Sequence, residues 1–167
     1  MSGVHFILGG ARSGKSRHAE ALVQARPQPW SYIATAQAFD DEMRARIAEH
    51  RGRRPQGWRT IDAPLDLAQA LREAGDSPVL IDCLTLWLTN LMLGEHDIEA
   101  AVVALLAAIL ARKALTVVVS NEVGLGIVPD NALSRRFRDE AGLLHQRVAE
   151  VADHVVLVVA GLPVQVK

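Results

Sequence analysis

Short runs of apolar residues alternate with longer segments of helical spacing along the chain. Five of the runs have the length and composition of buried strands, and they cover residues 4–8, 31–35, 79–82, 115–119 and 155–159. A further short candidate strand covers residues 58–62. Strands that alternate with helices in this way predict an α/β fold with a mostly parallel sheet.

The segments between the runs predict the helices, at residues 16–26, 40–50, 65–73, 85–93, 98–109 and 131–151. Phe39, Met43 and Ile47 recur every fourth residue, and this stripe, with His50 on the same side, is expected to face inward. Residues 100–111 are apolar without a break, which predicts a buried helix covered on more than one side. A subunit interface or burial within one subunit would supply that cover.

Residues 9–16 match the phosphate-binding pattern G-x-x-x-x-G-K-[ST] at every position and lie between a predicted strand and a predicted helix. The glycines at both ends of the loop let the backbone aim its N–H groups at a polyphosphate, and the helix N-terminus adds more of them. Lys15 can reach the β- and γ-phosphates, and the Ser16 hydroxyl is the expected Mg²⁺ ligand. Arg12 either contacts phosphate or is solvated.

Three further polar residues end or follow predicted strands, at the edge where open α/β sheets bind their ligands. Asp82 ends an apolar run as a Walker B carboxylate does, and it either holds Mg²⁺ with Ser16 or caps the strand. Thr35 either contacts the ligand or closes a turn. Glu122 either acts as general base for a substrate hydroxyl or stabilises its loop. With the phosphate loop, this arrangement predicts a P-loop NTPase fold of the RecA-like type, a three-layer sandwich.

His50 is followed at once by Arg51, Arg53 and Arg54. Guanidinium groups bind phosphate bidentately, and an imidazole beside such a clamp can act as a nucleophile toward an activated nucleotide. The alternative is a satisfied core histidine followed by a solvated basic turn.

Composition and charge indicate how many domains the chain forms, what kind of partner it binds and where it is located. A chain of 167 residues is expected to form a single domain, here a nucleotide-binding catalytic domain over residues 1–167. A net charge of −1 argues against nucleic acid or a membrane surface and favours a small partner. Cys83 is the one cysteine and the N-terminus lacks a signal-peptide pattern, which together predict the cytoplasm. The longest apolar run is too short to span a bilayer.

Segments beyond the phosphate loop complete a larger pattern, in this order: residues 9–17, 32–36, 41–43, 46–50, 54–55, 58–60, 120–124, 126–129, 136–139 and 141–142. Together they resemble the adenosylcobinamide kinase / adenosylcobinamide-phosphate guanylyltransferase family. The resemblance covers nearly the whole chain. It is therefore more specific than a phosphate loop, which predicts only a nucleotide binder.

The resemblance implies a bifunctional enzyme of cobalamin biosynthesis. One activity phosphorylates adenosylcobinamide with ATP or GTP. The other transfers GMP from GTP to that phosphate through a histidine, giving adenosylcobinamide-GDP and pyrophosphate. His50 matches the histidine, and Glu49 stands where many members carry a second one. The resemblance also implies a homo-oligomer, a trimer, and the apolar residues of 123–128 suit the edge of a corrinoid.

The expected site residues follow from the motifs and the resemblance together. The catalytic residues are His50, Lys15 and Glu122, and the metal ligands are Ser16 and Asp82. The nucleotide contacts are Gly9, Gly10, Ala11, Arg12, Ser13, Gly14, Lys15, Ser16, Ile33, Ala34, Thr35, Arg51, Gly52, Arg53, Arg54, Asp62 and Asp82.

Two other classes of function share the phosphate loop. A small-molecule kinase without guanylyltransferase activity would use Lys15, Ser16 and Asp82 but would not need His50. A regulatory GTP switch would be expected to carry an N-K-x-D guanine motif, which this chain lacks. Neither class accounts for residues 41–60.

Overall fold

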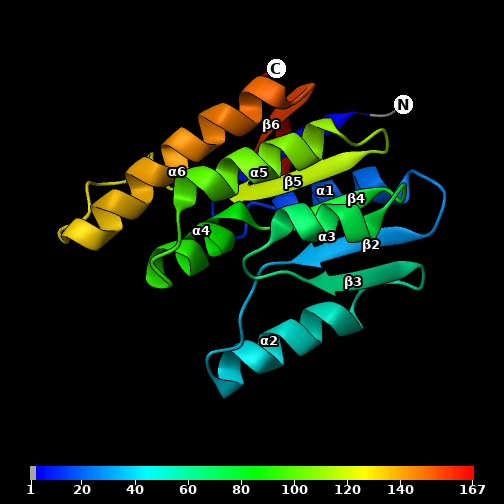
Figure 1. Ribbon diagram of the computed structural model, residues 1–167, viewed down its shortest axis with the longest axis horizontal. Helices are drawn as coiled ribbons and strands as arrows, with labels where there is room; N and C mark the ends of the chain where they lie inside the picture. Colours follow the sequence, from blue (N-terminus) through cyan, green and yellow to red (C-terminus); the bar gives the residue numbers. More distant parts are fainter. Residues whose placement is uncertain (1–2) are drawn as a thin grey trace.

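The computed structural model describes residues 3–167, apart from the side chain of His50, and its described part is a seven-stranded sheet flanked by helices (Figure 1). The strands are β1 (Val4–Gly9), β2 (Trp30–Ala34), β3 (Trp58–Asp62), β4 (Val79–Asp82), β5 (Thr116–Asn121), β6 (His154–Val159) and β7 (Leu162–Gln165). The helices are α1 (Lys15–Gln24), α2 (Asp41–Gly52), α3 (Leu67–Ala74), α4 (Leu84–Leu93), α5 (Ile98–Leu110) and α6 (Ala132–Val151).

The strand order is β3-β2-β4-β5-β1-β6-β7, and every neighbouring pair is parallel except β6 and β7. The predicted mostly parallel sheet is therefore confirmed. One strand, β5, separates β1 from β4. Because the strands run the same way, their carboxyl ends share one edge, where Gly9 pairs with Asn121 and Ala34 pairs with Asp82.

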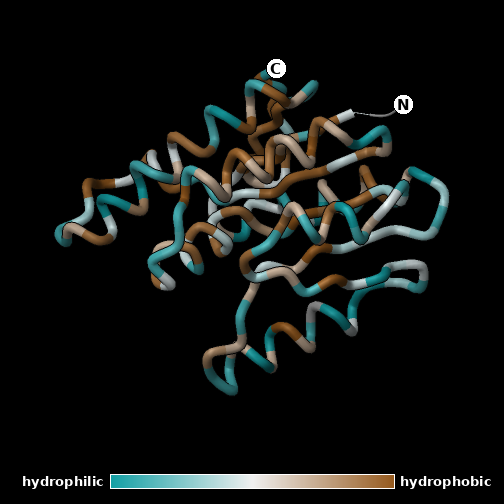
Figure 2. The backbone as a smooth tube through the Cα atoms, in the orientation of Figure 1, coloured by the Kyte–Doolittle hydropathy of each residue, from teal (hydrophilic) through white to brown (hydrophobic). Residues whose placement is uncertain are grey.

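Helices cover both faces of the sheet, which gives the predicted three layers. Because successive strand residues point to opposite faces, Phe6 packs with α3 to α6 and Ile7 packs with α1. Figure 2 shows the apolar strands concentrated between the helix layers. The helix α2 lies apart from the others, beside the edge strand β3 (Figure 1).

Two apolar surfaces remain exposed, and one prediction about the strands needs correction. Within one subunit the helix α5 buries only one stripe, while Val103 and Leu110 on its other side are 50% and 64% exposed, so cover by a subunit interface stays a prediction. In α6 the apolar residue Leu133 is exposed, because the start of this helix projects beyond the sheet (Figure 1). Residues 155–159 are not the last strand, since a tight turn returns the chain as the short antiparallel β7.

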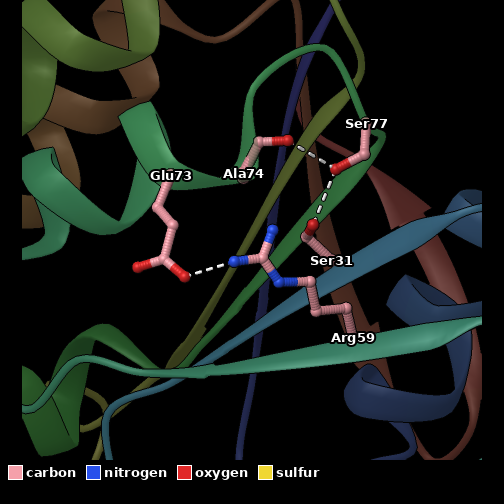
Figure 3. Close-up of polar contacts among 5 residues, drawn as sticks. All are labelled: Ser31, Arg59, Glu73, Ala74 and Ser77. Atoms are coloured by element: carbon pink, nitrogen blue, oxygen red, sulfur yellow. Dashed lines mark hydrogen bonds and ion pairs between the residues drawn. The ribbon is translucent and has the colours of Figure 1, made fainter.

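Polar contacts attach α3 to the strands beneath it (Figure 3). Arg59 on β3 forms an ion pair with Glu73 near the end of α3. The Ser77 hydroxyl donates to the carbonyl of Ala74 at 2.8 Å and accepts from the Ser31 hydroxyl of β2 at 2.6 Å. These contacts lie at the amino ends of β2 and β4, opposite the edge that carries the motifs.

A single arginine joins the same corner to β5. The Arg112 guanidinium donates to the Thr116 hydroxyl at 3.0 Å and to the carbonyls of Leu71, Gly75 and Ser77 at 2.6–2.9 Å. One side chain thus satisfies three carbonyls at the end of α3 and in the turn that follows it.

We predict that Arg112→Ala lowers the free energy of unfolding by about 2 kcal/mol, because hydrogen bonds to a charged group are lost together. Urea denaturation of the purified variant measures this. Lys113→Ala is the matched control, since Lys113 is exposed, and it should change stability by less than about 0.5 kcal/mol. Equal effects of the two substitutions would contradict the proposed role of Arg112.

Candidate functional site

The loop of residues 9–16 joins β1 to α1 and has the backbone of a phosphate cradle. Gly14, which precedes α1, has φ 93° and ψ 7°, and Arg12 has φ 55°. A Cβ on Gly9 would lie 2.9 Å from the backbone carbonyl oxygen of Val158 and 2.4 Å from Ser13 Oγ, so a larger residue does not fit without a shift of the backbone. The Lys15 side chain is 8% exposed and its Nζ donates to the Gly10 carbonyl at 3.0 Å. The loop thus directs N–H groups and an ammonium group at one concavity.

The turn between β6 and β7 packs against this loop and hydrogen-bonds to it. The Gly161 N–H donates to the Ser13 carbonyl at 2.8 Å. The Gly161 Cα lies where a Cβ on Gly14 would approach to 3.2 Å. Sequence reasoning missed this contact because it missed β7.

A cavity of about 660 Å³ opens at the carboxyl edge of the sheet and reaches across to α2. It brings together seven of the predicted site residues: Lys15, Ser16, Ala34, Arg51, Arg54, Asp62 and Asp82. Of the other predicted contacts, Ile33 and Thr35 are fully buried, and residues 9–14, Gly52 and Arg53 do not line this cavity. The His50 side chain lies outside the described part of the structure, so its predicted inward orientation stays a prediction.

Two of the three residues in the predicted inward stripe of α2 face this cavity, and none of the three packs into the core. Met43 and Ile47 line the cavity, and Phe39, just before the helix, is 69% exposed. None of the described side chains of α2 is buried. Asp40 caps the helix by accepting a hydrogen bond from the Met43 N–H at 2.7 Å. A helical period shows which side of a helix is apolar, but not what that side meets.

The three arginines at the end of α2 have different partners. Arg51 forms an ion pair with Asp62 at the end of β3. Arg53 pairs with Glu49 on the exposed side of the helix, which is the predicted solvated alternative. Arg54 lies with its guanidinium carbon 3.3 Å from the centre of the Tyr32 ring. Arg51 and Arg54 therefore present positive charge to the cavity, opposite Lys15.

Asp82 ends β4 beside the cavity and accepts a hydrogen bond from Tyr32 Oη at 2.6 Å. Burial and the neighbouring carboxylate raise the pKa of Tyr32 above its ordinary value, so the phenol remains a donor. Sequence reasoning missed Tyr32, because an aromatic residue in a buried strand has the pattern of a core residue. Residues two apart in a strand share one face, so Tyr32 lies on the same face of β2 as Ala34, which pairs with Asp82. This spacing was the signal that could have identified Tyr32.

Thr35 is fully buried, and its hydroxyl is engaged by the chain that follows β4. The hydroxyl donates to the Cys83 carbonyl at 2.8 Å and accepts from the Cys83 N–H at 2.9 Å. Asn90 donates to the Thr35 carbonyl at 2.8 Å. The Thr35 side chain therefore fixes the end of β2 against β4. Of its two predicted roles, this agrees with closing a turn and not with contacting the ligand.

Glu122 follows β5 and is tied to the phosphate loop through its backbone, since its N–H donates to the Gly9 carbonyl at 2.9 Å. Its carboxylate accepts from the Gly124 N–H within the same loop. Beneath it, His145 Nε2 lies 2.7 Å from the Ser120 hydroxyl, and burial lowers the pKa of this histidine. The Glu122 carboxylate is half-buried, so it stabilises its loop and is still accessible to a substrate.

The donor atoms at the cavity suit a hard cation held jointly with phosphate. The hydroxyl of Ser16 and the carboxylate of Asp82 both line it. Within residues 3–167, apart from the His50 side chain, no group of three or more His, Cys, Asp or Glu residues forms a metal cage. Oxygen donors in such small number fit Mg²⁺, which keeps waters and substrate phosphates among its ligands.

Comparison with solved structures agrees with this description. An ATPase from the type III secretion system of pathogenic bacteria superposes with a TM-score of 0.52 at 15% identity, over 98% of this chain and 56% of that chain. At that identity the likeness shows the fold alone. Fold and phosphate loop together make the chain a P-loop protein of the nucleoside-triphosphate-binding class, as predicted.

The sequence then identifies the family. The family model described as cobinamide kinase / cobinamide phosphate guanyltransferase matches residues 5–166, and the chain belongs to that family. It is accordingly a transferase with kinase and guanyltransferase activities. This outcome favours the bifunctional reading over a kinase that lacks guanyltransferase activity.

Curated relatives extend over nearly the same length. The bifunctional adenosylcobalamin biosynthesis protein CobP of Pseudomonas aeruginosa is 53% identical over 97% of this chain and 96% of that protein. The corresponding CobU protein of Salmonella typhimurium is 46% identical over 97% of this chain and 98% of that protein. Among the described residues, no helix is long and apolar enough to cross a membrane.

The loop geometry predicts different effects on stability when two glycines of the loop, Gly14 and Gly10, are replaced by alanine. Gly14→Ala places a Cβ in the left-handed region and against Gly161, so we expect it to lower the free energy of unfolding by about 1–2 kcal/mol. Gly10→Ala meets no described atom within 4 Å and should leave stability unchanged or slightly raised. Thermal denaturation without nucleotide measures both variants. Equal melting temperatures for the two would show that Gly161 does not constrain the loop.

Proposed function

We propose that the cavity between the phosphate loop and α2 is one site that serves both transferase activities. The enzyme first phosphorylates adenosylcobinamide with ATP or GTP. It then transfers GMP from GTP to the new phosphate, giving adenosylcobinamide-GDP and pyrophosphate, as a step of cobalamin biosynthesis. The observation that carries this proposal is that cations from two directions, Lys15 on one side and Arg51 and Arg54 on the other, line the same cavity.

The triphosphate of GTP lies on residues 9–16 in this proposal. The left-handed Gly14 and the start of α1 supply N–H donors, and Lys15 neutralises charge on the β- and γ-phosphates. Ala34 borders the nucleotide from β2, and Asp62 and Asp82 border it from the ends of β3 and β4, since all three line the cavity.

Mg²⁺ is the expected metal, held by Ser16 and Asp82. When bound, it would neutralise developing charge on the transferred phosphate. The proposal is supported by the oxygen donors that line the cavity and by the strand position of Asp82. The protein itself orients these donors before a nucleotide enters.

His50 is the proposed nucleophile of the guanylyl transfer. Its ring nitrogen forms a bond to the α-phosphorus of GTP while the bond to the bridging oxygen breaks, and pyrophosphate leaves with that electron pair. A phosphate oxygen of adenosylcobinamide phosphate then displaces the histidine, which is regenerated. Support comes from its backbone position in α2, one residue before Arg51, whose side chain lines the cavity.

Glu122 is the proposed general base of the kinase step, accepting the proton of the substrate hydroxyl. Its backbone bond to Gly9 keeps it beside the phosphate loop. The following loop exposes Leu125, Ile127 and Val128 at 84%, 98% and 60%, which provides an apolar surface for a corrinoid. Small substrates rather than nucleic acid or membrane remain the expected partners.

Assembly and location complete the proposal. We expect a homo-oligomer, a trimer, of a single catalytic domain (residues 1–167) in the cytoplasm. The exposed apolar side of α5, with Val103 and Leu110, supports an interface between subunits, because such a surface is costly to leave in water.

The decisive experiment detects a covalent guanylyl group. GTP labelled in the α-phosphate is incubated with enzyme and Mg²⁺, and the denatured protein is assayed for an acid-labile, base-stable label. Wild type should retain the label, and His50→Ala should lose it. His96→Ala is the matched control, because His96 is exposed after α4 and does not line the cavity, and it should label fully.

Lys15→Ala separates binding from chemistry. Without the ammonium group we expect at least a hundredfold slower labelling, since phosphate charge is no longer neutralised in the reacting state. If wild type binds GTP but takes no label, or if His50→Ala still labels, the histidine mechanism is wrong. The guanyltransferase step would then need another nucleophile or a direct transfer.

A further inference from the structure

Tyr32 lies between two charged groups of the cavity and contacts both. Its ring is 5% exposed, in the middle of β2, and it borders the same cavity as Lys15 and Ser16. Its hydroxyl contacts the Asp82 carboxylate, and the face of its ring contacts the Arg54 guanidinium. A side chain needed only for packing would require neither contact.

The hydroxyl fixes one oxygen of the carboxylate. Tyr32 Oη donates to Asp82 Oδ2 at 2.6 Å, and Oδ1 accepts no hydrogen bond from any residue that the structure describes. A carboxylate held through one oxygen has a defined rotamer and offers the other oxygen in a defined direction. Both neighbours in the sheet, β2 and β5, hold the strand that carries it.

The ring positions the guanidinium. The guanidinium carbon of Arg54 lies 3.3 Å from the ring centroid, and Arg54 Nη1 donates to the Thr60 hydroxyl of β3 at 2.9 Å. Trp58 packs edge-on against the ring, with centroids 6.0 Å apart and planes at 80°. The ring therefore cannot turn away from Arg54 without disturbing Trp58, and the cation is held at the cavity wall.

We propose that Tyr32 is a positioning residue that sets the metal-holding carboxylate of Asp82 and the phosphate-binding cation of Arg54 relative to each other. Its hydroxyl affects metal binding by orienting Asp82, and its ring affects nucleotide binding by holding Arg54. The two effects are separable, because phenylalanine keeps the ring and removes only the hydroxyl. This inference rests on the proposed Mg²⁺ role of Ser16 and Asp82, but not on the nucleophile His50.

The test measures metal and nucleotide binding directly, without turnover. The probe is the α,β-methylene analogue of GTP, whose α–β link cannot be broken by guanylyl transfer. Mn²⁺ binding to the enzyme–analogue complex is followed by electron paramagnetic resonance, and analogue binding in EDTA is followed by calorimetry. The variants are Tyr32→Phe, Tyr32→Leu and, as a matched control at the other contact of Arg54, Thr60→Val.

Each variant has its own expected pattern. Tyr32→Phe should weaken Mn²⁺ binding about tenfold, as loss of an outer-shell partner of a metal ligand does, and should keep analogue affinity in EDTA. Thr60→Val should leave Mn²⁺ affinity unchanged and weaken the analogue up to about fivefold. Tyr32→Leu should show both losses. Circular dichroism of the variants checks that each is folded.

A double-substitution cycle shows whether Tyr32 acts through Asp82. In an Asp82→Asn background, Tyr32→Phe should have no further effect on Mn²⁺ binding, because the carboxylate that it orients is gone. The positioning role is overturned if Tyr32→Phe weakens Mn²⁺ binding as much in the Asp82→Asn background as in wild type. It is also overturned if the single variant Tyr32→Phe binds Mn²⁺ as tightly as wild type. The cycle also covers the case in which Tyr32→Leu fails to fold.

Failure of the premise has a different signature. If wild type with the analogue binds no Mn²⁺, the metal role of Ser16 and Asp82 is wrong, and the inference about Tyr32 falls with it. If wild type binds Mn²⁺ but takes no label on His50, only the nucleophile is wrong. Tyr32 then still positions the metal site.

Discussion

The hydrogen bonds that hold the end of β1 between its two parallel neighbours are the constraint on which the site depends. They fix where the backbone leaves the sheet, and the phosphate loop begins at that point, at Gly9. The loop then has little conformational freedom, because the backbone N–H groups of Glu122 and Gly161 donate hydrogen bonds to its carbonyls. These two residues follow β5 and β6, the strands on either side of β1. Every other functional group is placed relative to this fixed loop.

The fold and the loop could be predicted because both depend on local pattern. Apolar runs alternated with helical spacing, and the glycine, lysine and serine positions of the loop are adjacent in sequence. The parallel direction of the strands could also be anticipated, and it brought Asp82 and Lys15 to one cavity. These features need no knowledge of which distant segments meet.

Features that depend on distant contacts could not be predicted. The stripe of Met43 and Ile47 looks the same whether it meets a core or a cavity. The Thr35 hydroxyl is engaged by Cys83, which lies 48 residues away in sequence. The turn that contacts the loop leads into β7, a strand that contains Pro163 and is too short for its pattern to stand out. Tyr32 has a core pattern because most of its ring is in fact packed.

The single cysteine gives the enzyme a practical property. Cys83 is 5% exposed, and burial, with Asp82 beside it, raises the pKa of its thiol, so little thiolate is present at neutral pH. We therefore expect this thiol to react slowly with maleimide reagents. A cysteine introduced at Ala45 of α2, which is exposed and does not line the cavity, would carry a fluorophore or spin label at one known place without removal of a native thiol. The motions of this helix during turnover could be followed in an otherwise unaltered enzyme.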